Sequence, residues 1–261
     1  MARAVSTVID VTVCLLLVSV AVSTLVVAVP DDDGSSKPDA DPVSESLGTT
    51  TAAVDTGHER RSHRTLAGHL AAAAVANGSV DGERIAPSPY PNGVRRAVRG
   101  HVDERTHVTV RWRPYSNVSF GGRLAVGETP PPGADVSTTR RVLNGGPSGP
   151  ETAEGFESLA TSVSVAYMDR LFPPERTRVA LLDSRTAKET ATRYRETAAI
   201  LGVDIEDELV AASTRRANER LADALAERFA AELEAAYPSA AAAIDDGAPG
   251  EIDLVVRRWE P

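Results

Sequence analysis

The fold is decided by the stretch THVTVRWRPYSNVSFGGRLAV, residues 106–126. Apolar and polar residues alternate on both sides of the Pro-Tyr-Ser-Asn segment at 114–117. A period of two is typical of strands with one buried face. We therefore expect an antiparallel hairpin with strands over 106–113 and 118–126 and a turn at 114–117.

Two further strands are expected outside this hairpin. One covers 135–143 and ends before the Asn-Gly-Gly-Pro sequence at 144–147. The other lies near the end of the chain, where Ile252, Leu254 and Val256 alternate with Asp253, Val255 and Arg257. Together these patterns predict a small antiparallel sheet.

Helical periodicity occupies most of the remaining sequence. Helices are expected over 65–76, over 94–102, from Pro150 to the proline pair at 173–174, and from 175 to 202 with an interruption near 183–184. Asp204 is the expected N-cap of a long helix that ends before Pro238. Its apolar stripe is expected to cover the sheet and consists of Leu221, Leu225, Phe229, Leu233 and Tyr237.

The composition favours a core of small side chains and an acidic surface. Aromatic residues make up 4% of the chain, and its formal net charge is -9. Lys37 and Lys188 are its only lysines, whereas arginine is abundant. This composition is typical of salt-loving archaea, and a high-GC genome would produce much of the same bias. The charge balance gives no support to nucleic-acid binding. Cys14 is the only cysteine, so an intramolecular disulfide is excluded.

An apolar segment near the start of the chain predicts a membrane anchor. Residues 11–29 carry no charge, and the span 8–29 is long enough to cross a hydrocarbon layer of about 30 Å. Arg3 precedes this span and an acidic stretch follows it, so residues 1–7 are expected in the cytoplasm. A cleaved signal peptide is the main alternative, but its apolar core is shorter.

The predicted architecture follows from these segments. Residues 30–57 are rich in Asp, Ser, Gly, Pro and Thr and predict a flexible tether. Residues 58–261 are expected to form an extracellular α+β domain. The predicted fold class is therefore α+β, with an N-terminal transmembrane helix, a flexible tether and an external domain whose small antiparallel sheet packs against several helices.

The segment from Arg3 to Asp10, followed directly by the apolar run, resembles the start of archaeal type IV pilin-like proteins. The resemblance implies processing after Ala4 by a dedicated peptidase, and Asp10 would then pair with the terminal amine of a neighbouring subunit. The alternative is that Asp10 is hydrated at the headgroup level. The whole chain is similar to an uncharacterised group of haloarchaeal membrane-anchored proteins associated with pilus or secretion-type systems.

The chain lacks a convincing catalytic or metal-binding motif. His58, His63 and His69 are spaced by five and six residues, which does not place them on one helical face. No nucleophile elbow or phosphate-binding loop occurs. The acidic run at 31–33 is expected to be a solvated spacer. No cofactor is therefore expected, although an unrecognised hydrolase is a third alternative.

Two sequons, at Asn77 and Asn117, predict N-glycosylation of an external domain. The leading functional hypothesis is a non-enzymatic, single-pass cell-surface protein, an accessory pilin-like or secretion-associated subunit that binds protein partners in addition to the lipid bilayer. The alternative is a membrane-anchored extracellular sensor or ligand-binding module.

Overall fold

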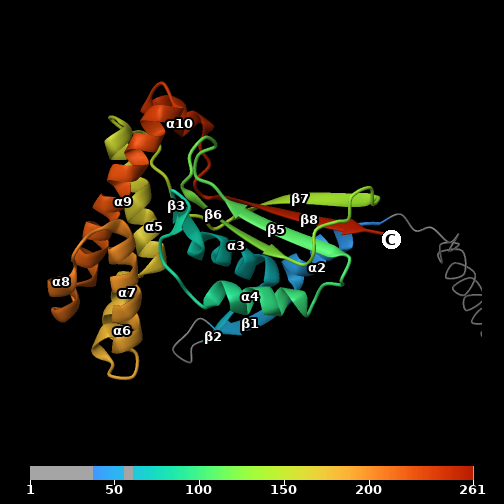
Figure 1. Ribbon diagram of the computed structural model, residues 1–261, viewed down its shortest axis with the longest axis horizontal. Coiled ribbons are helices and arrows are strands. Elements are labelled where there is room, and N and C mark those ends of the chain that lie inside the picture. The colour runs from blue at the N-terminus through green and yellow to red at the C-terminus, as the bar shows by residue number, and fades with distance from the viewer. Residues whose placement is uncertain (1–37, 56–60, 261) are drawn as a thin grey trace, which may run out of the picture. The chain divides into compact units, whose positions relative to one another are not determined.

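The computed structural model describes residues 38–55 and 61–260. Element labels follow Figure 1. The helices are α2 (Asp41–Thr49), α3 (Leu66–Ala76), α4 (Tyr90–Arg99), α5 (Phe156–Leu171), α6 (Pro174–Leu182), α7 (Ala187–Leu201), α8 (Glu206–Val210), α9 (Thr214–Ala236) and α10 (Ala240–Asp246). The strands are β1 (Thr51–Asp55), β2 (Arg61–Thr65), β3 (Gly78–Val80), β4 (Glu83–Arg84), β5 (Thr106–Trp112), β6 (Gly121–Val126), β7 (Val136–Asn144) and β8 (Glu251–Trp259).

A six-stranded sheet with the order β4-β3-β6-β5-β8-β7 organises the domain. All its neighbouring strands are antiparallel, and β8 lies between β5 and β7. The predicted hairpin is present, but its second strand begins at Gly121 because residues 113–120 form a longer connection. A separate two-stranded sheet joins β1 to β2.

One face of the six-stranded sheet is covered by helices. Figure 1 shows α3 and α4 on the same side of the strands, and α3 contacts β5, β6, β7 and β8. Val110 and Leu254 are paired across β5 and β8 on this face and are fully buried. Gly122 allows the close approach of α3, because a Cβ there would lie 2.0 Å from the carbonyl oxygen of Ala74. These contacts form the core of the sheet layer.

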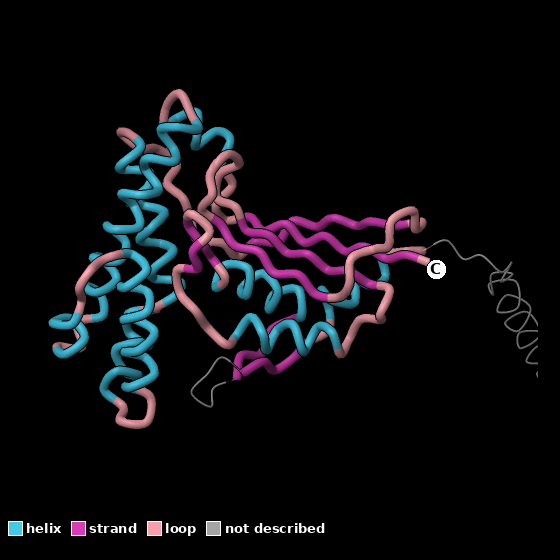
Figure 2. The backbone as a smooth tube through the Cα atoms, in the orientation of Figure 1, coloured by secondary structure: helices cyan, strands magenta, loops and turns pink. Residues whose placement is uncertain are grey.

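Helices α5 to α9 gather at one end of the strands, as Figure 2 shows. Helices α5 and α9 pack against each other, and aromatic rings connect them to the sheet. Trp112 stacks on Tyr167 with ring centroids 5.3 Å apart, and Phe120 contacts Phe229 at 5.0 Å. The predicted apolar stripe of the long helix is buried. However, it packs mainly against α5 and these rings, so the prediction that it covers the sheet is wrong.

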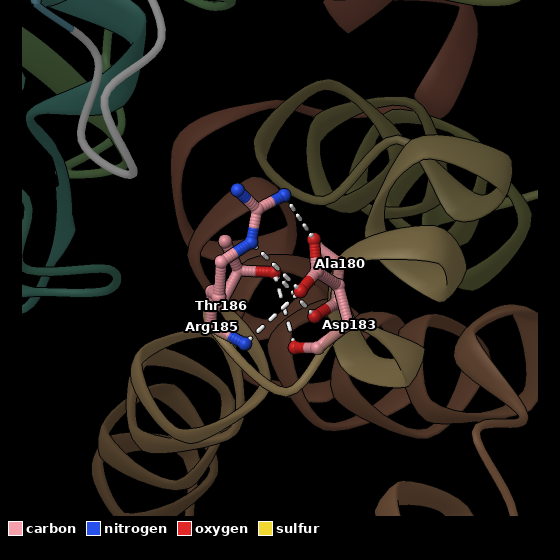
Figure 3. Close-up of polar contacts among 4 residues, drawn as sticks. All are labelled: Ala180, Asp183, Arg185 and Thr186. Atoms are coloured by element: carbon pink, nitrogen blue, oxygen red, sulfur yellow. Dashed lines mark hydrogen bonds and ion pairs between the residues drawn. The ribbon is translucent and has the colours of Figure 1, made fainter.

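The break between α6 and α7 is fixed by local hydrogen bonds (Figure 3). Thr186 Oγ1 donates to the carbonyl oxygen of Ala180 at 2.7 Å, and the Arg185 backbone N–H donates to Asp183 Oδ1 at 3.0 Å. The interruption predicted near 183–184 is therefore confirmed. A second break separates α8 from α9, where Ala212 has a φ of 48°. The long helix consequently begins at Thr214, and the prediction that Asp204 is its N-cap is wrong.

The predicted fold class requires correction. The described residues form an α+β structure with an antiparallel sheet packed on helices, and none of their helices is long and apolar enough to cross a membrane. The predicted span, 8–29, lies outside the described residues. The predicted flexible tether is also wrong for 38–55, because α2 and β1 lie there and bury Leu47 and Val54. The few apolar residues of this segment are placed on the faces that pack against the domain.

Candidate functional site: an arginine groove on the open sheet face

The face of the sheet opposite α3 contains a groove of about 700 Å³. Among the described residues, its lining combines small and apolar residues with five arginines and a single carboxylate, that of Asp253. The arginines come from β5, β6, β7, β8 and the connection after β5, and they are Arg111, Arg113, Arg123, Arg140 and Arg257. This concentration of positive charge contrasts with the formal net charge of -9 of the whole chain.

Strand register explains why these arginines meet. Residues on one strand alternate between the two sheet faces, so paired residues on neighbouring strands share a face. Arg111 on β5 is paired with Arg123 on β6 and, on its other side, with Asp253 on β8. The residues between them on β5, Val110 and Trp112, point into the core and are fully buried. The fold therefore forces both arginine side chains onto the open face.

Asp253, the only carboxylate among the described residues that line the groove, is already engaged. Arg140 donates to Asp253 Oδ1 from Nε at 2.9 Å and from Nη2 at 2.7 Å. Within 38–55 and 61–260, no hydrogen bond or ion pair occupies the side chains of Arg111, Arg123 or Arg257. All three are exposed. Like charges directly opposite each other on neighbouring strands are destabilising, so the Arg111–Arg123 pair can be stabilised by an anionic ligand.

One wall of the groove is held firmly by α9. Val118 and Ser119 belong to this wall. The carboxylate of Glu232 accepts hydrogen bonds from the Ser119 backbone N–H at 2.7 Å, from Ser119 Oγ at 2.6 Å and from the Phe120 backbone N–H at 3.3 Å. Backbone donors to a carboxylate are among the stronger hydrogen bonds in proteins. These bonds hold this wall of the groove in place.

The same connection is fixed at its other end. The hydroxyl groups of Ser116 and Tyr237 donate to Asp246 Oδ2, the latter at 2.6 Å. These two hydrogen bonds hold the pKa of the Asp246 carboxyl below its usual range, the bond from Ser116 having the larger effect. Among residues 38–55 and 61–260, no histidine takes part in this cluster, and the group that accepts from the Ser116 hydroxyl is the Asp246 carboxylate.

Of the three histidines that the sequence singles out, His69 is engaged in structural contacts. His69 Nε2 lies 3.0 Å from the carbonyl oxygen of Ala52, and its Nδ1 lies 2.7 Å from the Tyr90 hydroxyl. A carbonyl can only accept, so Nε2 carries the proton and Tyr90 donates to Nδ1. Burial lowers the pKa of His69 and raises the pKa of Tyr90 to about 12. His63 is exposed on β2, whereas His58 lies outside the described residues.

The other residues singled out by the sequence do not come together. Arg3, Ala4 and Asp10, like the acidic run at 31–33, lie outside the described residues. Asn77 ends α3, and its Nδ2 donates to the carbonyl oxygen of Arg123 at 2.7 Å. Asn117 is exposed in the connection between β5 and β6. Neither asparagine lines the groove.

The arginine groove was not predicted from the sequence. Its signal was present, because arginine occupies the outward positions 111, 123 and 257 of three predicted strands. Alternation within one strand shows which side chains share a face, but it does not show which strands are neighbours. The pairing of β8 with both β5 and β7 was needed to place these arginines side by side.

The fold and the groove define an α+β protein with an open, arginine-lined sheet face. The chain belongs to a family of unknown function, DUF7284, whose family model matches residues 9–259. The predicted membership of an uncharacterised family is confirmed in this form. Comparison with curated proteins and with solved structures found no match.

Proposed function

We propose that this chain is a non-enzymatic cell-surface protein that binds an acidic segment of a protein partner in the arginine groove. The observation that carries the proposal is the pair Arg111 and Arg123, which lie directly opposite each other and whose side chains form no hydrogen bond or ion pair among the described residues. The carboxylate opposite Arg111 on β8, that of Asp253, is bound by Arg140. Such a pair opposes sheet formation on its own. Carboxylates of a partner would offset the repulsion and form charge-assisted hydrogen bonds with the guanidinium groups.

A protein partner fits the groove better than a nucleic acid. Proteins that bind single strands combine basic grooves with exposed aromatic rings on which bases stack. Here both tryptophans are buried, Trp112 completely and Trp259 to 7% exposure. Carboxylates need no stacking surface, and arginine pairs with them in a bidentate geometry.

The finer biological assignment rests on the sequence. We propose that the chain is an accessory subunit of a pilus or secretion-type assembly in a salt-loving archaeon, located at the cell membrane with residues 58–261 outside the cell. The support is the resemblance of the segment from Arg3 to Asp10 to pilin-like proteins and the arginine-rich, lysine-poor composition. We also propose that the external domain is N-glycosylated. Of the two sequon asparagines, Asn117 is more exposed than Asn77.

Groove binding is tested with a fluorescein-labelled acidic nonapeptide, TVTDDVTVT, titrated with the protein while anisotropy is recorded. The double variant Arg111→Glu/Arg123→Glu is expected to reduce affinity about tenfold or more, because each lost charged contact is worth about 1.5–3 kcal/mol. The control is Arg176→Glu/Arg178→Glu, two exposed arginines on α6 that do not line the groove. Equal affinities of the two variants would refute the proposal.

Competing ligands sharpen this experiment. The neutral peptide TVTNNVTVT is expected to bind weakly, and an oligothymidylate of equal length is expected not to displace the acidic peptide. If the oligonucleotide binds more tightly than the acidic peptide, the proposed partner is a nucleic acid instead of a protein.

The alternative function, an extracellular ligand-binding module, is favoured by the same arginine pair if the natural ligand is small. Sulfate and succinate are suitable probes, because each carries two negative charges within the reach of one arginine pair. Saturable binding of either probe that is lost in Arg111→Glu/Arg123→Glu, with no binding of the acidic peptide, would support this alternative.

The pilin-like assignment has a separate test. Mass spectrometry of the protein purified from its own cells is expected to show a mature chain that begins after Ala4. A mature chain that retains Arg3 and Ala4 would overturn the pilin-like assignment, while leaving the binding activity of the groove untouched.

A further inference from the structure

The strand next to the groove, β7, has a free edge within the described residues. It spans Val136–Asn144 and, of the strands that the structure describes, pairs only with β8. No backbone group between 136 and 144 makes a hydrogen bond outside this ladder in the part of the chain that the structure describes. In an antiparallel pair every second residue directs its N–H and C=O away from the neighbour. Among residues 38–55 and 61–260, nothing pairs with the outward donors and acceptors of β7.

This edge is long, extended and basic. Many proteins protect edge strands by keeping them short or by bulging them. β7 instead has nine residues and continuous pairing with β8 from Val136 to Asn144. Arg140 and Arg141 occupy its centre, and the strand contains no acidic residue. Because successive side chains on a strand point to opposite faces of the sheet, Arg140 and Arg141 lie on different faces.

We propose that the partner segment binds as an additional antiparallel or parallel strand along β7, with acidic residues beside Arg140 and Arg141. This inference rests on the proposed function and specifies the form in which the partner binds. Main-chain hydrogen bonds to β7 would supply affinity, and the two arginines would select acidic side chains. Residues that continue beyond the added strand can then enter the arginine groove beside it.

A second copy of this chain is a poor occupant of the same edge. Pairing two β7 strands antiparallel along their full length places residue 140 opposite its own copy. Arg140 would then face Arg140, and Arg141 would face Thr139. Like charges directly opposite each other are destabilising. Charge complementarity thus favours a different, acidic chain.

The bond between Arg140 and Asp253 is compatible with this arrangement. Arg140 holds Asp253 through Nε and Nη2, and its side chain remains 67% exposed. A guanidinium group has five N–H donors, so donors remain available for a second carboxylate. Val142, on the same face two residues further along, is 55% exposed and offers an apolar contact to the added strand.

Backbone methylation of the probe peptide tests strand addition without altering the protein. Two versions of TVTDDVTVT carry N-methyl groups at either the odd or the even internal positions, so that only one version blocks the amides directed at β7. We expect one version to lose affinity about tenfold or more and the other to bind nearly normally, because only alternate amides face the neighbouring strand. Equal affinity of both versions for the protein would overturn strand addition.

Protein variants separate this inference from the proposed function. Arg141→Glu, on the edge but outside the groove lining, is expected to weaken peptide binding about fivefold, with Arg178→Glu as the control. Hydrogen exchange is expected to slow at residues 136–144 on peptide binding. Suppose that Arg111→Glu/Arg123→Glu abolishes binding, while the peptide binds the unchanged protein without slowing exchange along β7. Strand addition is then wrong and groove binding stands. If neither set of variants alters binding, both are wrong.

Discussion

Gly78 and Tyr167 meet where β3 passes α5. A Cβ at Gly78 would lie 2.1 Å from the hydroxyl oxygen of Tyr167 and 2.8 Å from its Cζ. Tyr167 is completely buried, and its hydroxyl has no hydrogen-bond partner among the described residues. Burial also raises the pKa of Tyr167, so the hydroxyl stays neutral. This contact makes glycine necessary at 78 for steric reasons rather than for backbone conformation.

Gly78→Ala is expected to destabilise the domain by about 1–3 kcal/mol, because overpacking a rigid core forces backbone or ring shifts. Tyr167→Phe is expected to be neutral or stabilising by about 1 kcal/mol, since it removes a buried, unpaired hydroxyl. The double variant should recover part of the loss, because the closest clash is removed while the Cζ contact remains. Urea unfolding of all four proteins measures the coupling. Strictly additive effects would show that the two residues do not meet.

His69 should make stability depend on pH in a defined window. Its pKa is lowered in the fold, chiefly by burial. Below the pKa of about 6.5 expected for the unfolded chain, the unfolded state binds a proton that the folded state does not, so stability decreases as the pH falls. The loss levels off once the pH is below the folded pKa.

We expect chemical denaturation between about pH 7 and pH 5 to show this decrease. The double variant His69→Leu/Tyr90→Phe removes both polar partners and should have a flatter profile over the same range. His63→Leu, an exposed histidine on β2, is the control. If the free energy of unfolding of the double variant depends on pH in the same way as that of the unchanged protein, groups other than His69 cause the pH dependence.

At the scale of elements, helix α9 holds the wall of the groove through Glu232. The carboxylate receives two backbone N–H groups and one hydroxyl group from Ser119 and Phe120. This connection follows the strand that carries Arg111. We therefore expect the helices at the end of the sheet to influence binding on the open face, although none of their side chains lines the groove.

Glu232→Ala is expected to lower the free energy of unfolding by about 1–3 kcal/mol, because it leaves two backbone donors without their carboxylate. It should also raise the Kd for the acidic nonapeptide, since the groove wall loses its support. Glu234→Ala is a matched control on the exposed side of the same helix. Unchanged amide exchange at 118–120 in Glu232→Ala would contradict this role of Glu232.

The elements were predictable to different degrees from the sequence. Helix α3 and strands β5, β7 and β8 follow from strong local periodicity and were predicted within one or a few residues at their ends. The start of the long helix was missed because Asp204 is followed by a short helix and by the left-handed turn at Ala212. Helix α2 was missed because its buried face contains only Ser44 and Leu47, too few for a compositional signal.

At the scale of the whole molecule, strand order limited what the sequence could reveal. Alternation predicted that Arg111, Arg123 and Arg257 point outward, and this is confirmed by their exposure. Their assembly into one groove depends on pairings between residues more than a hundred positions apart, such as Arg111 with Asp253. Periodicity contains no information on such pairings. The sequence likewise did not show which face of the sheet is covered by helices, because this follows from the packing of α3 against β5 and β6.

The central position of β8 also has a consequence for biosynthesis. Strands β5 and β7 are made early, yet each depends on β8, the last strand of the sheet to leave the ribosome. Until residues 251–259 emerge, β7 has no neighbour and the hairpin of β5 and β6 exposes a second edge. Exposed edges of this kind invite pairing with other chains. A nascent chain should therefore need shielding until residues 251–259 have left the ribosome, and the arginines of these strands provide some protection through charge repulsion.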